Sequence, residues 1–264
     1  MSKQMMRLDK LLGNMGLGTR SEIKKAVKQG KVAVDGVVVK DSGLQVEPAR
    51  QKIEFEGTPV VYKSEIYLLL NKPQGVISAT EDMRERTVID LLREEDRLLQ
   101  PFPVGRLDKD TEGLLLLTND GQLAHELLSP RKHVNKTYEA LVRGAVNEED
   151  KVQFALGVEL DDGYVTMPAN LVIHEVKEDG GDEEANSFIS LTIQEGKFHQ
   201  VKRMFEAVGK KVVKLRRVAM GPLQLDESLD LGQYRELTDE ELAALRAHRG
   251  GQKLVSGGEG QDEI

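Results

Sequence analysis

A glycine-bounded apolar run near the middle of the chain most constrains its fold. Residues 105–121 are GRLDKDTEGLLLLTNDG, in which Gly113 begins the run 114–117 and the turn residues 119–121 end it. A short continuous apolar run between turn signals is typical of a strand that is buried on both faces. Asp108 is then expected on a loop at one end of a core strand, where rigid scaffolds often carry functional side chains. Taken alone, however, an isolated loop acid more often only shapes a turn.

Composition limits the class of protein. The 264 residues include 39% hydrophobic and 31% charged residues and no cysteine, which is typical of a globular chain with one large domain or two smaller ones. Without cysteine the chain forms neither disulfides nor Cys-based zinc sites, and it suits a reducing cytosol. The first ten residues lack the apolar core of a signal peptide, and no run approaches the length of a membrane span. We therefore expect a cytoplasmic protein without a membrane partner.

Charge is distributed unevenly along the chain. The formal net charge is −8, yet residues 1–60 contain eleven Lys and Arg against seven Asp and Glu, a balance of +4. Residues 197–217 contain eight against one, a balance of +7, whereas residues 223–264 contain four against ten, a balance of −6. Local basic surfaces can therefore exist on an acidic protein, and nucleic acid is not excluded as a partner.

The first sixty residues predict a small module. Apolar residues at 8, 11, 12 and 15 predict one helix, and Thr19 with Glu22 forms the capping box of a second. Asp35-Gly36 between two valine-rich runs predicts a hairpin. The second helix and the turn after it carry a row of basic residues: Arg20, Lys24, Lys25, Lys28 and Lys31. On its own, such a charged helix face is usually only solvated.

The rest of the chain predicts more strands than helices. We expect strands at 66–70, 114–117, 136–142, 164–176, 188–193 and 211–225. We expect helices at 87–92, between Gly121 and Pro130, from Asn147, at 198–208 and from Thr238. Because the two kinds of element do not alternate regularly, a mixed or mostly antiparallel sheet flanked by helices fits better than a doubly wound sheet.

The sequence predicts two domains and contains no cofactor motif. We place one domain at 1–62 and a second at 63–249, and we expect a mobile acidic loop at 177–186 and a disordered tail at 250–264. The sequence has no P-loop, no dinucleotide fingerprint and no HExxH, and its five histidines lack metal-ligand spacing. No nucleotide, NAD or metal site is predicted.

Residues 105–121 match the signature of one family. Pseudouridine synthases carry G-R-L-D-x-x-T-x-G-L-x-L-L-T-x-D-G, and every fixed position of it is present here. The N-K-P-x-G at 71–75 resembles the start of the synthase domain, and TRSEIKKAVKQGKVAVDG at 19–36 resembles the S4 RNA-binding domain. The resemblance, which covers residues 5–247, implies an α+β protein with a small N-terminal S4-like domain followed by a synthase domain. It makes the basic helix face a contact for RNA phosphates.

The resemblance also implies a chemistry. Pseudouridine formation breaks the N-glycosidic bond of uridine, turns the uracil and rejoins it through carbon, so it requires no cofactor. Asp108 would be the catalytic aspartate, acting as nucleophile or acid–base. Lys202 in HQVK would be its cationic partner, with Arg203 as an alternative. Tyr138 in KTY would pack on the uracil, and Arg106 would lie beside the flipped nucleotide. Apart from the resemblance, these last two are an ordinary strand tyrosine and a surface arginine.

Within the family, the chain resembles most the small-subunit rRNA enzymes. The similarity lies in the S4 module, in HQVKRMFEAVG at 199–209 and in LDLGQYRELTDEEL at 229–242. It implies 16S rRNA, at a uridine of the position 516 type, or a small-subunit precursor particle as the partner of a monomeric enzyme. Two alternatives stay open. One is a 23S rRNA synthase, because large-subunit relatives share both domains and the aspartate motif. The other is a non-catalytic ribosome-assembly protein that binds RNA.

Overall fold

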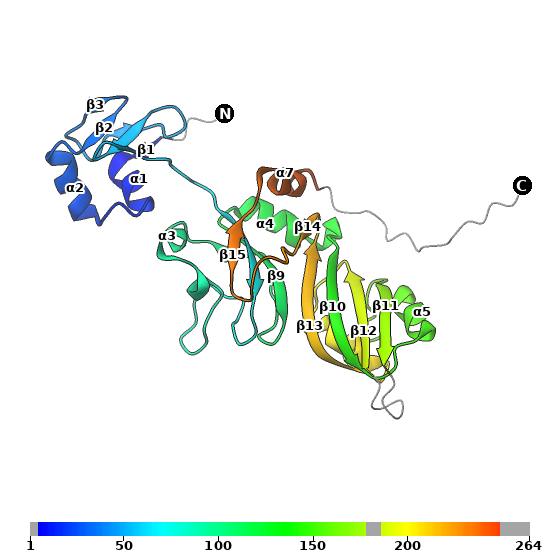
Figure 1. The fold of residues 1–264 in the computed structure, drawn as a ribbon. Coiled ribbons are helices and arrows are strands. Elements are labelled where there is room, and N and C mark those ends of the chain that lie inside the picture. The colour runs from blue at the N-terminus through cyan, green and yellow to red at the C-terminus, as the bar shows by residue number, and fades with distance from the viewer. Residues whose placement is uncertain (1–4, 178–185, 249–264) are drawn as a thin grey trace, which may run out of the picture. The chain divides into compact units, whose positions relative to one another are not determined.

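A computed structural model describes residues 5–177 and 186–248 of the chain (Figure 1). The chain divides into two units, Met1–Ile66 with Leu92–Pro101, and Tyr67–Leu91 with Phe102–Ile264. The domain boundary that we expect after residue 62 stays a prediction. The expected tail, and the expected acidic loop apart from its two end residues, lie outside the described residues.

The first unit consists of short helices and two small sheets. Its elements are β1 (Met6–Arg7), α1 (Leu8–Asn14), α2 (Arg20–Lys28), β2 (Val32–Val34), β3 (Val37–Val38), β4 (Gln45–Val46), β5 (Ile53–Phe55), β6 (Thr58–Pro59) and α3 (Glu94–Arg97). One sheet has the order β3-β2-β5-β6, and β1 pairs with β4 in the other. The predicted capping box is present, since Thr19 and Glu22 exchange side chain-to-backbone hydrogen bonds at the start of α2. The apolar sides of both helices, including Leu12 and Ile23, enclose the core of the unit.

The second unit is organised around a mixed sheet. Its strands are β7 (Tyr67–Lys72), β8 (Phe102–Pro103), β9 (Glu112–Thr118), β10 (Lys136–Arg143), β11 (Asn170–Lys177), β12 (Asn186–Ile193), β13 (Lys211–Met220), β14 (Leu223–Gln224) and β15 (Tyr234–Glu236). Within the described residues the order is β11-β12-β10-β13-β9-β7-β15, with β14 on β13 and β8 on β9. Figure 1 shows β13, β10, β12 and β11 side by side. The β9–β13 pair is parallel and the other pairs are antiparallel, which confirms the expected sheet class.

The two halves of this sheet meet at Gly113. β9 pairs with β7 from Gly113 to Thr118, but with β13 only through Glu112 and Gly113. Gly113 has a φ of +104°, and a Cβ there would collide with the backbone of Arg217, so glycine is required. Past the junction, the buried Arg217 side chain donates from Nε to the carbonyl of Leu114 at 2.8 Å. This side chain thus replaces the hydrogen bond that β13 no longer provides.

Helices and 3₁₀ turns cover the sheet. They are η1 (Ile89–Leu91), α4 (Gly121–Leu128), η2 (Pro130–Lys132), α5 (Glu148–Leu156), α6 (Gln200–Ala207) and α7 (Asp239–Ala247). α5 packs on β11 and α6 on β13, while Leu127 of α4 and Leu245 of α7 share a core with Leu114 and Leu116 of β9. The predicted cap of α7 is present at Thr238. No described helix is long and apolar enough to cross a membrane.

Three expected elements differ from the structure. The helix expected over 87–92 is only the three-residue η1, because Asp90 accepts from the backbone N–H of Thr87 at 2.8 Å and the next residues bridge to Ile77. The strand expected over 164–176 begins only at Asn170, because the residues before it form a loop closed by backbone hydrogen bonds between 158 and 166. The helix expected over 198–208 begins at Gln200, since His199 has a φ of +49°.

Candidate active site

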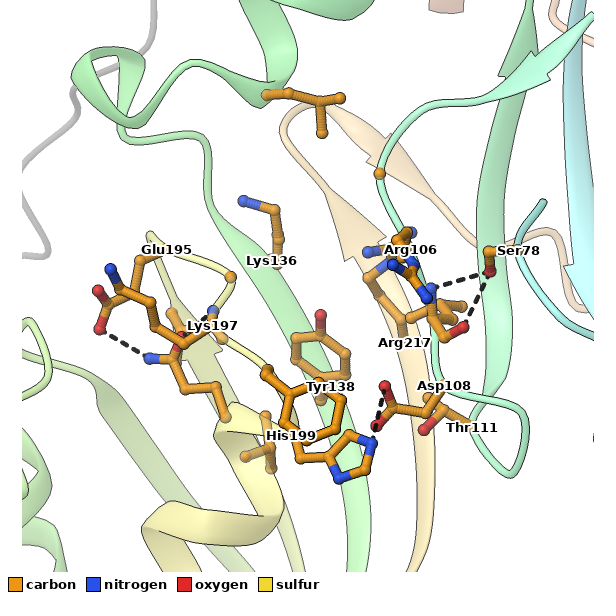
Figure 2. Close-up of a pocket in the computed structure, with 18 of the residues that line it drawn as sticks. Ser78, Arg106, Asp108, Thr111, Lys136, Tyr138, Glu195, Lys197, His199 and Arg217 are labelled. Atoms are coloured by element: carbon orange, nitrogen blue, oxygen red, sulfur yellow. Dashed lines mark hydrogen bonds and ion pairs between the residues drawn. The ribbon is translucent and has the colours of Figure 1, made fainter. Parts of the chain in front are cut away.

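A cavity of about 790 Å³ lies on the second unit. Its lining comes from the loop before β9, from β10, from the segment between β12 and α6, and from β13 (Figure 2). Three residues that the sequence singles out, Arg106, Asp108 and Tyr138, line this cavity together. The charged side chains in the lining are Arg106, Lys109, Lys136, Lys197 and Arg217 against Asp108 and Glu195. The cavity thus has a balance of +3 on a chain of net charge −8, which favours an anionic ligand.

Asp108 lies on the loop between β8 and β9 and meets a lysine from α6. The Nζ of Lys202 lies 3.2 Å from Oδ2 of Asp108 and 2.6 Å from Oδ1 of Asp110, so one ammonium bridges two carboxylates. Burial acts to lower the pKa of Lys202, but the hydrogen bond to Asp110 and the charge of Asp108 outweigh it and raise that pKa. The same hydrogen bond lowers the pKa of Asp110. A cation therefore stays beside Asp108 at neutral pH.

Arg203 does not share this position. Its guanidinium pairs with the carboxylates of Asp161 and Asp162, in the loop before β11. Its Nη1 also donates to the backbone carbonyl of Phe198 at 3.4 Å. Arg203 therefore holds two loops together, and Lys202 alone of this basic pair reaches Asp108.

A buried lysine holds the loop that carries Asp108 through hydrogen bonds to backbone carbonyls. Lys72 is fully buried at the end of β7, and its Nζ donates to the carbonyls of Pro73, Asp108 and Thr111 at 3.0, 3.0 and 2.9 Å. Burial lowers the pKa of Lys72 to about 8, although nearby carboxylates act to raise it. The sequence interpretation missed this role, because 71–75 predicts only a turn. The available signal was a lysine directly after a buried strand, a place where an unpaired charge is costly.

A histidine that the sequence interpretation also missed lies on the other side of Asp108. The Nε2 of His199 is 3.6 Å from Oδ1 of Asp108 (Figure 2). Its ring stacks on that of Phe198, with centroids 3.8 Å apart and planes 19° from parallel. Metal-ligand spacing, which the histidines lack, does not reveal a carboxylate partner. Among the described residues, no group of three His, Cys, Asp or Glu side chains is placed to hold a metal ion.

β10 contributes two side chains to the cavity, Lys136 and Tyr138, which lie two residues apart and so share one face of the strand. Tyr138 is 8% exposed and lines the cavity together with Asp108 (Figure 2). Burial, and secondarily the positive charge of Arg217, lower the pKa of Lys136 to about 8. The alternation that predicts this strand therefore also places a half-buried lysine beside the tyrosine.

The basic row of the first unit is where the sequence predicts it. Arg20, Lys24, Lys25 and Lys28 on α2 are all exposed, as is Lys31 just after the helix. The opposite side of α2 is buried in the core. Lys31 forms a salt bridge with Glu56 at 2.6 Å, so its charge is partly neutralised. The four helix residues therefore form the stronger candidate for a phosphate-binding surface.

Comparisons with known proteins identify the family. The model of the RNA pseudouridylate synthase family matches residues 66–207, and that of the S4 domain matches residues 6–51. An uncharacterised RNA pseudouridine synthase of Bacillus subtilis is 54% identical over 240 residues, which are 91% of this chain and 98% of that protein. The chain belongs to the RNA pseudouridine synthase family and has an N-terminal S4 domain.

Two relatives carry names that specify a ribosomal subunit. Ribosomal small subunit pseudouridine synthase A of Yersinia pestis is 39% identical over 92% of this chain and 99% of its own length. Ribosomal large subunit pseudouridine synthase B of Bacillus subtilis is 40% identical over 92% and 96%. A crystal structure of a pseudouridylate synthase, 38% identical, matches with a TM-score of 0.60 over 91% of this chain and 99% of its own. Membership in the family is shown, and the two subunit names occur at almost equal identity.

Proposed function

We propose that this pseudouridine synthase isomerises a uridine of 16S rRNA, of the position 516 type, in naked RNA or in a small-subunit precursor. The observation that carries the proposal is the Asp108–Lys202 pair beside a cationic cavity of about 790 Å³, a size that accepts a nucleotide. The small-subunit assignment is supported by HQVKRMFEAVG at 199–209 and by the relatives named for that subunit.

In this proposal Asp108 does the chemistry and its neighbours prepare it. The carboxylate attacks the nucleotide or transfers a proton while the bond from C1′ to N1 breaks and the bond from C1′ to C5 forms. The proton on C5 leaves and N1 regains one, so the net reaction is an isomerisation. Lys202 places a positive charge 3.2 Å from Oδ2 of Asp108 and so orients that carboxylate. Tyr138 packs against the uracil, and Arg106 occupies the space that the flipped base vacates.

The S4 domain would supply affinity that does not depend on sequence. The exposed row Arg20, Lys24, Lys25 and Lys28, followed by Lys31, can neutralise RNA phosphates and release counterions. We propose that the enzyme works in the cytoplasm, because its proposed substrate is ribosomal RNA, and that it works as a monomer.

The test is tritium release from 5-tritiated uridine in 16S RNA or small-subunit precursors. Wild type should release tritium, and Asp108→Ala should release none, because no other carboxylate in the cavity lining lies at that position. Asp82→Ala is the matched control, since Asp82 is an exposed loop acid that only bonds the backbone N–H groups of Arg84 and Glu85. It should keep wild-type release.

Each other result decides between the alternatives. Release from 23S RNA but not from 16S RNA would move the target to the large subunit. Release that persists in Asp108→Ala would refute the assigned carboxylate. A protein that releases no tritium from either RNA could still act in ribosome assembly. If a strain with Asp108→Ala then shows the same ribosome assembly as a strain with the wild-type protein, a non-catalytic RNA-binding protein is supported.

A further inference from the structure

An exposed aromatic side chain lies at the rim of the cavity without a role in the chemistry above. Phe198 lines the cavity and is 76% exposed, although burial of such a side chain is normally favourable. It lies between Gly196 and α6, in the segment that directly precedes the helix bearing Lys202. A large apolar ring left in water beside a functional cavity points to a ligand that covers it.

The ring is held in place rather than free to turn away. One of its faces stacks on His199, at 3.8 Å between centroids, and His199 itself lies 3.6 Å from Asp108. The backbone of His199 is left-handed, with a φ of +49°, a strained conformation that the surroundings must support. The stack therefore extends outward from the catalytic carboxylate as a fixed ledge.

Backbone and side-chain hydrogen bonds fix the segment beneath this ledge. The N–H of Lys197 donates to Oε1 of Gln200 at 2.9 Å, and Gln200, 4% exposed, donates from Nε2 to Glu195 at 2.7 Å. The carbonyl of Phe198 accepts from Arg203, which is itself clamped by two aspartates. The segment is thus preorganised, which reduces the entropy that a ligand must overcome on binding.

The surroundings of the ledge select a nucleic-acid base as its occupant. The ammonium of Lys197, the preceding residue, lies 4.2 Å from the ring centroid of Tyr164, so a second aromatic ring and a cation share the cavity lining with Phe198. Aromatic rings set among cations are the usual surface for unpaired bases, because the rings stack and the cations neutralise phosphates. An apolar peptide would gain nothing from a lining whose charge balance is +3.

We propose that Phe198, backed by His199, is a stacking platform for the nucleobase directly adjacent to the target uridine in the RNA strand. The inference rests on the proposed RNA substrate. Once the target nucleotide is flipped toward Asp108, its neighbour in the strand loses one stacking partner. Phe198 lies one ring beyond His199, which contacts Asp108, so it is placed to replace that partner. The platform thereby stabilises the flipped state and not the RNA duplex.

The test is a double-mutant cycle that combines a substitution in the protein with the removal of a base from the RNA. Tritium release is measured in single turnover at subsaturating RNA, on whichever rRNA fragment wild type modifies, either intact or abasic at the nucleotide before or after the target. Phe198→Ala should lower the rate on intact RNA about 10-fold, the usual scale for one base–aromatic stack. One abasic position should lower the wild-type rate by a similar factor, and Phe198→Ala should lose nothing more on that RNA.

Two variants separate stacking from a merely structural role. Phe198→Tyr should restore the rate, whereas Phe198→Leu, of similar bulk, should not. Phe188→Ala is the matched control, because Phe188 is a 39% exposed phenylalanine on β12 that packs against His174, with centroids 5.3 Å apart, and does not line the cavity. It should retain the wild-type rate on every RNA.

A binding measurement keeps the inference testable if no rRNA fragment releases tritium. Asp108→Ala protein is titrated into 16S and 23S fragments that carry 2-aminopurine beside the candidate uridine. Stacking on Phe198 should change the 2-aminopurine fluorescence. The change should disappear when Phe198→Ala is combined with Asp108→Ala in the same chain, and it should persist when Phe188→Ala is combined instead. The platform would be overturned if Phe198→Ala and the abasic position lowered the rate independently, so that their factors multiply, or if Phe198→Leu restored the rate. It would also be overturned if the fluorescence did not change, or if the change did not depend on Phe198. Failure of the 16S assignment alone would only change the fragment used.

Discussion

Replacing Lys72 by methionine should lower the rate of this enzyme strongly and its free energy of unfolding only slightly. Methionine has about the length of the lysine stem and no charge, so it fills the same buried space. The change deletes the ammonium that holds the carbonyls of Asp108 and Thr111 at 3.0 and 2.9 Å. The loop that carries Asp108 then loses its support from β7, while the core around it stays packed.

Two opposing terms set the effect on stability. Three hydrogen bonds from a charged donor, at about 1.5 kcal/mol each, amount to roughly 4–5 kcal/mol that the variant loses. Burial lowers the pKa of Lys72 from 10.5 to about 8, which corresponds to a cost on the order of 3 kcal/mol for burying the charge in wild type. Methionine removes this cost. The free energy of unfolding should therefore fall by only about 1–2 kcal/mol.

The effect on rate should be larger. A displacement of a catalytic group by about 1 Å can lower a rate roughly 100-fold, and in the variant the backbone of Asp108, the proposed catalytic residue, is released on one side. Single-turnover tritium release and urea unfolding of the same preparations would measure both quantities. The matched control is Lys210→Met, because Lys210 forms a buried pair with Asp150 at 2.8 Å outside the cavity lining. It should lose about 3 kcal/mol by leaving a buried charge unpaired and keep its rate. Wild-type rate in Lys72→Met would refute the reasoning.

Three further outcomes follow from the structure. Burial lowers the pKa of Lys136 to about 8 from an ordinary 10.5. Between these pH values the unfolded chain binds more protons than the folded chain, so the free energy of unfolding increases with pH. Lys136→Met should flatten that increase in denaturation measured from pH 7 to 10. Gly113→Ala should cost on the order of 3 kcal/mol in chemical denaturation because of its positive φ and the collision at β13, whereas Gly121→Ala, with open space around its Cβ, should cost almost nothing. Lys24→Glu with Lys28→Glu should weaken RNA binding and reduce its dependence on salt in filter binding, and an unchanged salt slope would make the row only a solvated face.

Local signals predicted much of the fold. The capping boxes of α2 and α7 join residues three positions apart, so the sequence alone is sufficient to recognise them. The run 114–117 predicts a buried strand because its flanking glycines and its length are also local features. The helix expected over 87–92 does not form because the backbone N–H of Val88 donates to the carbonyl of Ile77, eleven positions away, a contact that no helical period reveals.

The site depended on contacts between distant parts of the chain. Asp108 and Lys202 are 94 positions apart, and only the resemblance to the family, not spacing, indicated that they meet. Two of the three carbonyl partners of Lys72, those of Asp108 and Thr111, are 36 and 39 positions away, and backbone atoms carry no sequence signal. His199 escaped notice because its contact with Asp108 requires a left-handed residue where the pattern predicts a helix.

The way in which β9 is covered has a consequence for the synthesis of the chain. One edge of this apolar strand pairs early with β7, but the other is closed by β8, by the side chain of Arg217 and by two residues of β13. Arg217 follows Gly113 by 104 positions, which a ribosome needs roughly 5–20 s to add. During that interval part of the strand edge remains open to pairing with other chains. Nascent chains halted before Arg217 should therefore aggregate more readily than the finished protein.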